Sequence, residues 1–134
     1  MSKQREYDVE PIRDDDLLYR RFHPTSLRLD GTVDFSAFTK HNSSEPDPEI
    51  SVDLARKTAP EKTLADVPRA LVNVLGLAVL KAGDVRRLGF TVHHDPKRRN
   101  RAHSLIEGAK TETDCYLLAQ ITQVHTLPPS ISST

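Results

Sequence analysis

The chain has 134 residues with 19 basic and 19 acidic side chains, so its formal net charge at pH 7 is zero. This length predicts one domain with a substantial core, and the balanced charge excludes a global positive field that would draw the protein onto nucleic acid or anionic lipid. The longest apolar run is far shorter than the roughly 20 residues of a membrane-spanning helix. A single cysteine, Cys115, excludes an internal disulfide. We therefore expect a cytoplasmic protein with no membrane association.

Hydrophobic residues make up 37% of the chain and charged residues 28%, a balance that favours flexible ends around a smaller core. We expect a flexible N-terminal tail over residues 1–13 and a single α+β domain over residues 14–126. Prolines and serines near the end predict a disordered C-terminal tail over residues 127–134.

Short elements are expected in the first half of the domain. Three aspartates, Asp14 to Asp16, are typical of a cap for one helical turn over residues 17–19. Hydrophobic residues spaced by two on either side of Asp30-Gly31 predict a hairpin, because this dipeptide tolerates a positive φ. An extended piece over residues 50–52 precedes Asp53, which can cap a helical turn that ends at Lys57. A further helical turn can begin at Pro60, since proline is tolerated at the first helical position.

The second half predicts strands around a short helix. Residues 72–80 are rich in aliphatic side chains and indicate a strand buried on both faces. A helix over 82–88 ends at Gly89, strands follow over 90–93 and 102–107, and a final helix covers residues 111–124. Together these elements predict an α+β fold with a small mixed or antiparallel sheet of about five short strands and a C-terminal helix packed on one face.

Five short motifs occur in order between residues 17 and 125. They are Tyr19-Arg20-Arg21 with His23-Pro24, Ser36-Ala37-Phe38, Ser51-Val52-Asp53, Asp95-Pro96, and Asn100 with Ala102-His103. As an ordered set, they resemble a family of small uncharacterised bacterial proteins. The resemblance implies a bacterial cytoplasmic origin and carries over no activity. Similar sequences tend to have a proline where this chain has Arg101.

Titratable side chains are concentrated between residues 90 and 110. His94 or His103, with Asp95 orienting an imidazole, could act as general base and acid on a phosphodiester, since histidine titrates closest to neutral pH. If the two flanking strands pair in antiparallel fashion, His93 and His103 share one face. The same residues could suit zinc, but adjacent histidines on a strand point to opposite faces, so we expect no metal site and no cofactor.

Four basic side chains lie in the polar turn between His94 and His103. In the catalytic interpretation these side chains would hold phosphate, and nucleic acid is then a partner of the loop over residues 97–101. The alternative is a solvent-exposed turn that carries charge, which we favour. The residues concerned are Lys97, Arg98, Arg99 and Arg101.

A second basic cluster lies near the start of the domain. Arg20 and Arg21 could clamp a phosphate or a carboxylate, with Tyr19 or Phe22 stacking on a base. Alternatively, Arg21 and His23 tie the N-terminal segment to the acidic loop near residues 45–49, and we favour this structural role. Cys115 has apolar neighbours and is expected in the core rather than as a nucleophile.

The sequence favours a small binding or adaptor module that acts through a protein partner or a phosphate-bearing ligand. Acidic residues gather in the first half of the chain and basic residues in the second, an asymmetry that favours a protein partner. The alternative is a metal-independent phosphoesterase or nuclease-like enzyme that uses the loop between His93 and His103.

Overall fold

A computed structural model describes residues 8–40 and 43–129. These residues form a six-stranded antiparallel sheet with the strand order β4-β5-β2-β1-β3-β6. The strands are β1 (Leu17–Phe22), β2 (Glu49–Leu54), β3 (Gly76–Lys81), β4 (Thr91–His94), β5 (His103–Glu107) and β6 (Gln123–Thr126). The helices are α1 (Pro60–Ala65), α2 (Ala82–Arg87) and α3 (Glu112–Gln120), with short 3-10 turns η1 (Pro24–Ser26), η2 (Phe35–Phe38), η3 (Ala55–Lys57) and η4 (Arg69–Leu71). The predicted α+β class is confirmed, including the C-terminal helix on the core.

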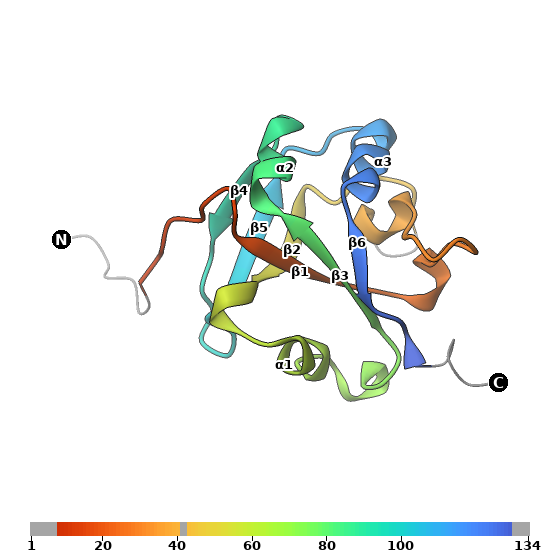
Figure 1. Cartoon of the computed structure of the whole chain (residues 1–134), viewed down its shortest axis with the longest axis horizontal. Helices are drawn as coiled ribbons and strands as arrows, with labels where there is room; N and C mark the ends of the chain where they lie inside the picture. The colour runs from red at the N-terminus through yellow and green to blue at the C-terminus, as the bar shows by residue number, and fades with distance from the viewer. Residues whose placement is uncertain (1–7, 41–42, 130–134) are drawn as a thin grey trace.

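The core lies on one face of this sheet. Alternate residues of the central strands, such as Leu18, Ile50 and Ile106, point to the same side and are fully buried. They pack with Phe38 of η2 and Leu118 of α3. Figure 1 shows α2 and α3 on one side of the sheet and α1 on the other. Because α1 is short, part of the second face stays accessible.

Several predicted boundaries are confirmed. Helix α1 begins at Pro60, and α2 ends just before Gly89, whose φ of 99° provides the left-handed termination. Thr111 caps α3 in a capping box with Asp114, because each side chain accepts a hydrogen bond from the other residue's backbone N–H. Leu118 is buried as expected, but the helix ends at Gln120, and residues 123–126 form strand β6 where the sequence predicted the end of the helix.

The predicted helical turn at residues 17–19 is wrong. Asp16 instead accepts a hydrogen bond from the backbone N–H of Arg13, and the chain continues as β1 between β2 and β3. The strand predicted over 72–80 begins only at Gly76, because η4 and the left-handed Asn73, with φ of 63°, precede it. A Cβ at Gly76 would overlap the Phe22 ring, so this position needs glycine.

The expected hairpin at Asp30-Gly31 is reduced to a tight turn. The backbone N–H of Arg28 donates to the carbonyl of Thr32, and Gly31 has φ of 87°, but only the isolated bridge Leu27↔Val33 follows. Residues 35–38 form η2 rather than a strand, since the Asp34 side chain accepts a hydrogen bond from the Ser36 N–H and caps the turn.

Residues in both predicted tails are packed into the folded domain. Ile12 is buried and belongs to the core cluster, although it falls within the expected N-terminal tail. Pro128 is fully buried within the expected C-terminal tail. Residues 1–7 and 130–134, which hold the rest of both tails, lie outside the described residues. In the described part of the chain, no helix is both long and apolar enough to cross a membrane.

Candidate functional site at the gap between β1 and β2

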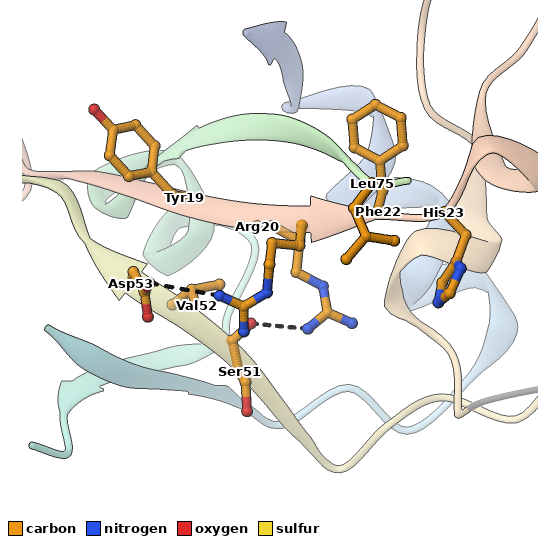
Figure 2. Close-up of a pocket in the computed structure, with 9 residues that line it drawn as sticks. Tyr19, Arg20, Phe22, His23, Ser51, Val52, Asp53 and Leu75 are labelled. Atoms are coloured by element: carbon orange, nitrogen blue, oxygen red, sulfur yellow. Dashed lines mark hydrogen bonds and ion pairs between the residues drawn. The ribbon is translucent and has the colours of Figure 1, made fainter. Parts of the chain in front are cut away.

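Strands β1 and β2 pair over only part of their length. Their ladder contains Leu18↔Leu54 and Tyr19↔Asp53, whereas β1 pairs with β3 from end to end. Beyond Tyr19 the two strands diverge and leave a hollow of about 200 Å³ (Figure 2). We call this region the gap site, and its polar lining residues are Tyr19, Arg20, Arg21, His23, Ser51 and Asp53.

Arg20 occupies the gap and replaces the missing ladder. Its Nε and Nη2 donate to the carbonyl of Ala37 at 3.0 and 2.9 Å, and its Nη1 donates to the carbonyl of Ser51 at 2.8 Å. Figure 2 shows the side chain between β1 and β2 with the Ser51 contact drawn. Burial lowers the pKa of the Arg20 guanidinium to about 10, although the nearby charge of Asp47 opposes this shift.

Within the described residues, none of the ion pairs involves Arg20. Its hydrogen bonds to neutral carbonyls also use fewer N–H donors than a guanidinium has. Arg20 is therefore a fixed, partly buried cation at the edge of a hollow, with donors left for an anion.

Arg21 extends toward α1 and also lines the gap site. Its Nη1 donates to the Thr63 carbonyl at 3.1 Å and lies 3.7 Å from Asp53 Oδ2. Asp53 is buried and accepts hydrogen bonds from Thr63 Oγ1 at 2.8 Å and Asn100 Nδ2 at 2.7 Å. The expected capping role of Asp53 is therefore wrong, because its carboxylate instead joins β2 to α1 and to the turn at Asn100.

A larger hollow of about 550 Å³ shares part of this wall. Arg20, Arg21, Phe22 and His23 line both spaces. Lys40 adds a further cation, which forms an exposed ion pair with Glu45 at 3.3 Å. The remaining lining residues are mostly hydroxylic: Thr25, Ser26, Ser36, Ala37, Thr39, Ser43 and Asp47.

Two of the predicted catalytic residues meet beside the gap site. His103 Nδ1 lies 3.0 Å from the Asp95 carbonyl oxygen and 3.2 Å from Asp95 Oδ2, and its Nε2 lies 3.2 Å from Ser51 Oγ. Burial by itself would raise the pKa of Asp95, but the hydrogen bond and charge of Lys97, followed by His103, lower it. Asp95 therefore orients the imidazole as the sequence predicted, and Ser51 is an additional member of this group.

The third predicted catalytic residue, His94, lies on the opposite face of β4. Its Nδ1 accepts a hydrogen bond from the Glu10 N–H at 2.9 Å, and its Nε2 donates to the Arg101 carbonyl at 2.6 Å. Both ring nitrogens are thus engaged in holding the chain. His93 shares the face of His103, as expected from the strand pairing, and its Nδ1 lies 3.3 Å from Glu107 Oε1.

The residues 97–101, which we call the basic turn, do not present one cationic surface. Lys97 forms an ion pair with Asp95 at 3.2 Å. Arg101 lines a separate hollow near His94, together with Asp8, Glu10 and Lys57. Arg98 and Arg99 are exposed on the turn that the Lys97↔Asn100 bridge closes. The four predicted phosphate-binding side chains therefore diverge.

Phe22 and Cys115 are core residues. Phe22 is 2% exposed, so the predicted stacking of a base on its ring is wrong, and Tyr19 instead makes an edge contact with the His125 ring. Burial raises the pKa of the Cys115 thiol to about 11, which agrees with its predicted place in the core.

The described residues contain no cluster of three or more His, Cys, Asp or Glu side chains arranged for a metal ion.

Residues from four of the five sequence motifs contact one another around the gap site, and Asp95 of the remaining motif contacts His103. Arg20 of the first motif binds Ala37 of the second and Ser51 of the third. His103 and Asn100 of the last motif contact Ser51 and Asp53, respectively. Residues far apart in the sequence thus form one polar cluster. In comparisons with known proteins, no family model, curated protein or solved structure matches the chain.

Proposed function

We propose that the protein binds a small phosphate-bearing ligand at the gap site. The observation that carries this proposal is Arg20, a cation fixed by two backbone carbonyls, partly desolvated, and not ion-paired within the described residues. A guanidinium in this state offers charge-assisted hydrogen bonds without the entropic cost of ordering a flexible side chain. We place this activity in the cytoplasm, in keeping with the single reduced cysteine.

The surroundings of Arg20 also favour phosphate. Arg21, His23 and Lys40 line the adjoining hollows, and hydroxyl groups supply further donors. The gap site, at about 200 Å³, is smaller than the roughly 300–1,000 Å³ of typical small-molecule sites, but the adjoining hollow of about 550 Å³ shares four of its lining residues. Asp47 is the carboxylate in the lining of that hollow, so basic side chains outnumber acidic ones there.

A protein partner is less well supported than a small ligand. The large hydrophobic side chains exposed on the described surface sit on separate segments, as in Leu29 on the tight turn, Val72 before β3 and Tyr116 on α3. Tyr116 already stacks on Phe35, with ring centroids 4.7 Å apart. Val72 lines one small, mainly apolar hollow of about 230 Å³ with Leu64 and Leu75, and nothing on the described surface shows what would cover it.

Isothermal titration with pyrophosphate tests the proposal. The wild-type protein should give saturable binding, and Arg21→Gln should weaken it about tenfold or more, the range expected for a hydrogen bond to a charged group. Lys40→Gln, on a more exposed side chain, should weaken binding about threefold to tenfold and should leave the fold intact. Lys97→Gln is the matched control, because this lysine lies on the basic turn.

Absence of saturable binding at millimolar pyrophosphate would contradict the proposal, as would an equal loss in the Lys97→Gln control. A short oligonucleotide should be titrated in parallel. Salt-dependent oligonucleotide binding that requires Arg98 and Arg99 but not Arg21 would replace the small ligand with nucleic acid.

A further inference from the structure

Ser51, His103 and Asp95 form a continuous hydrogen-bonded chain that ends at the gap site. Ser51 Oγ lies 3.2 Å from His103 Nε2, and His103 Nδ1 lies 3.2 Å from Asp95 Oδ2. Ser51 also lines the small hollow together with Arg20 and Arg21. We infer that Ser51 is a nucleophile that accepts a phosphoryl group from a phosphate monoester, with His103 as general base. This inference rests on the proposed phosphate binding.

The tautomer of His103 suits this role. Nδ1 lies 3.0 Å from the backbone carbonyl of Asp95, which can only accept a hydrogen bond, so Nδ1 carries the proton. Nε2 therefore has a lone pair and accepts a hydrogen bond from the Ser51 hydroxyl. A serine nucleophile needs its base in this form. Asp95 is the positioning residue, since it fixes the ring through both its carbonyl and its carboxylate.

The backbone of Ser51 is also directed at the gap. The Leu54 N–H donates to the Ala102 carbonyl at 2.7 Å, so the even-numbered residues of β2 face β5 with their backbone groups. The odd-numbered Ser51 therefore directs its N–H and C=O at β1, and Arg20 binds that carbonyl. Since the β1–β2 ladder includes no pair beyond Tyr19↔Asp53, the Ser51 N–H lies where a ligand oxygen could reach it.

The proposed reaction balances without a metal or an additional reagent besides water. Ser51 Oγ attacks phosphorus while its proton moves to His103 Nε2. The P–O bond to the alcohol breaks, and the departing alcohol oxygen takes the proton from His103. Water then attacks the phosphoserine, giving its proton to Nε2, and the P–Oγ bond breaks to release phosphate as Oγ regains the proton. Arg20 and Arg21 offset the negative charge on the phosphoryl oxygens throughout.

A fluorophosphonate probe tests Ser51 directly, because it phosphonylates an activated serine whatever the natural alcohol is. After incubation, peptide mass spectrometry should locate one adduct on Ser51 of the wild-type protein, and Ser51→Ala should carry none. His103→Gln should slow labelling by about 10²- to 10⁴-fold, the usual contribution of one general base. His93→Gln is the matched control, since that histidine shares the strand face but contacts Glu107, and its labelling rate should change less than about twofold.

Asp95→Asn provides a readout that a purely structural role would not move. Removing the carboxylate leaves the imidazole less firmly oriented toward Ser51, so labelling should slow while pyrophosphate affinity stays unchanged. Circular dichroism of each variant confirms that it is folded.

Two failures can be distinguished by adding the pyrophosphate titration. If pyrophosphate binds but Ser51 is not labelled, or if His103→Gln labels at the wild-type rate, the nucleophile inference is overturned and the binding proposal stands. If wild-type protein does not bind pyrophosphate, both fail. The supporting result is labelling of Ser51 that depends on His103, in a wild-type protein that binds pyrophosphate.

Discussion

The molecule carries two arginine-rich regions that differ in how their charges are held. At the gap site, Arg20 is fixed by the carbonyls of Ala37 and Ser51 and borders a hollow. On the basic turn, Arg98 and Arg99 are exposed to solvent, and Lys97 is paired with Asp95. The first region has lost conformational entropy on folding, whereas the second would lose it on binding. The proposed function therefore depends on how each charge is fixed rather than on local charge density.

Replacing Arg20 should have the largest effect on stability. Arg20→Met keeps an aliphatic side chain of similar length but leaves the Ala37 and Ser51 carbonyls without their donor, at an expected cost of about 2–4 kcal/mol in the free energy of unfolding. Urea denaturation measures this quantity. Arg98→Met is the control and should stay within about 0.5 kcal/mol of wild type. Equal values for the two variants would mean that Arg20 is not fixed in the gap.

Asp53 connects the two regions, because it lines the gap site beside Arg21 and accepts a hydrogen bond from Asn100 of the basic turn. Asp53→Asn removes the charge next to Arg21 and turns one acceptor into a donor that faces the Asn100 amide. We expect a loss of about 1–3 kcal/mol in urea denaturation. Amide hydrogen exchange should also increase on the basic turn. Unchanged exchange there would mean that Asp53 does not couple the two regions.

Acid should weaken the ion pair between Asp95 and Lys97. Although burial opposes it, Lys97 and then His103 lower the pKa of Asp95 below its ordinary value of 3.8. A carboxyl group with a lowered folded-state pKa stabilises the protein above the unfolded value, and this contribution disappears as the pH falls through the folded value. Lys97→Ala should therefore reduce the loss of stability between neutral pH and pH values below about 3.8. Denaturation curves should be measured for both proteins at the two pH values. The prediction is contradicted if Lys97→Ala and wild type lose the same free energy of unfolding between them.

The smallest effect is expected for the double change Arg98→Ala and Arg99→Ala. Exposed side chains away from caps and packed contacts contribute little, so the free energy of unfolding should change by less than about 0.5 kcal/mol. Pyrophosphate affinity should also be nearly unchanged. A marked loss of affinity would move the ligand from the gap site to the basic turn.

Local patterns were sufficient to predict most elements of the second half of the chain. Pro60, Gly89 and Thr111 each carry a termination or capping signal that depends only on neighbouring residues, and each bounds the expected helix. The segment at residues 17–19 was mispredicted, because its strand conformation depends on pairing with residues 76–81, far along the chain.

The site was predictable only in part, for the same reason. Asp95 and His103 are close in sequence, so their contact could be anticipated. Ser51 meets His103 only through the β2–β5 pairing, and nothing near Ser51 in the sequence indicates this. Arg20 was identified as a candidate, but its fixation depends on η2 and on the divergence of β1 from β2.

The most direct test of the central claim is to follow arginine side-chain Nε–H signals by NMR during a pyrophosphate titration of ¹⁵N-labelled protein. The Arg20 signal should be visible before ligand is added, because its Nε–H is held by Ala37, and it should shift together with that of Arg21 as the site saturates. The signals of Arg98 and Arg99 should stay in place. Saturable shifts at Arg98 and Arg99 with none at Arg20 and Arg21 would contradict the account.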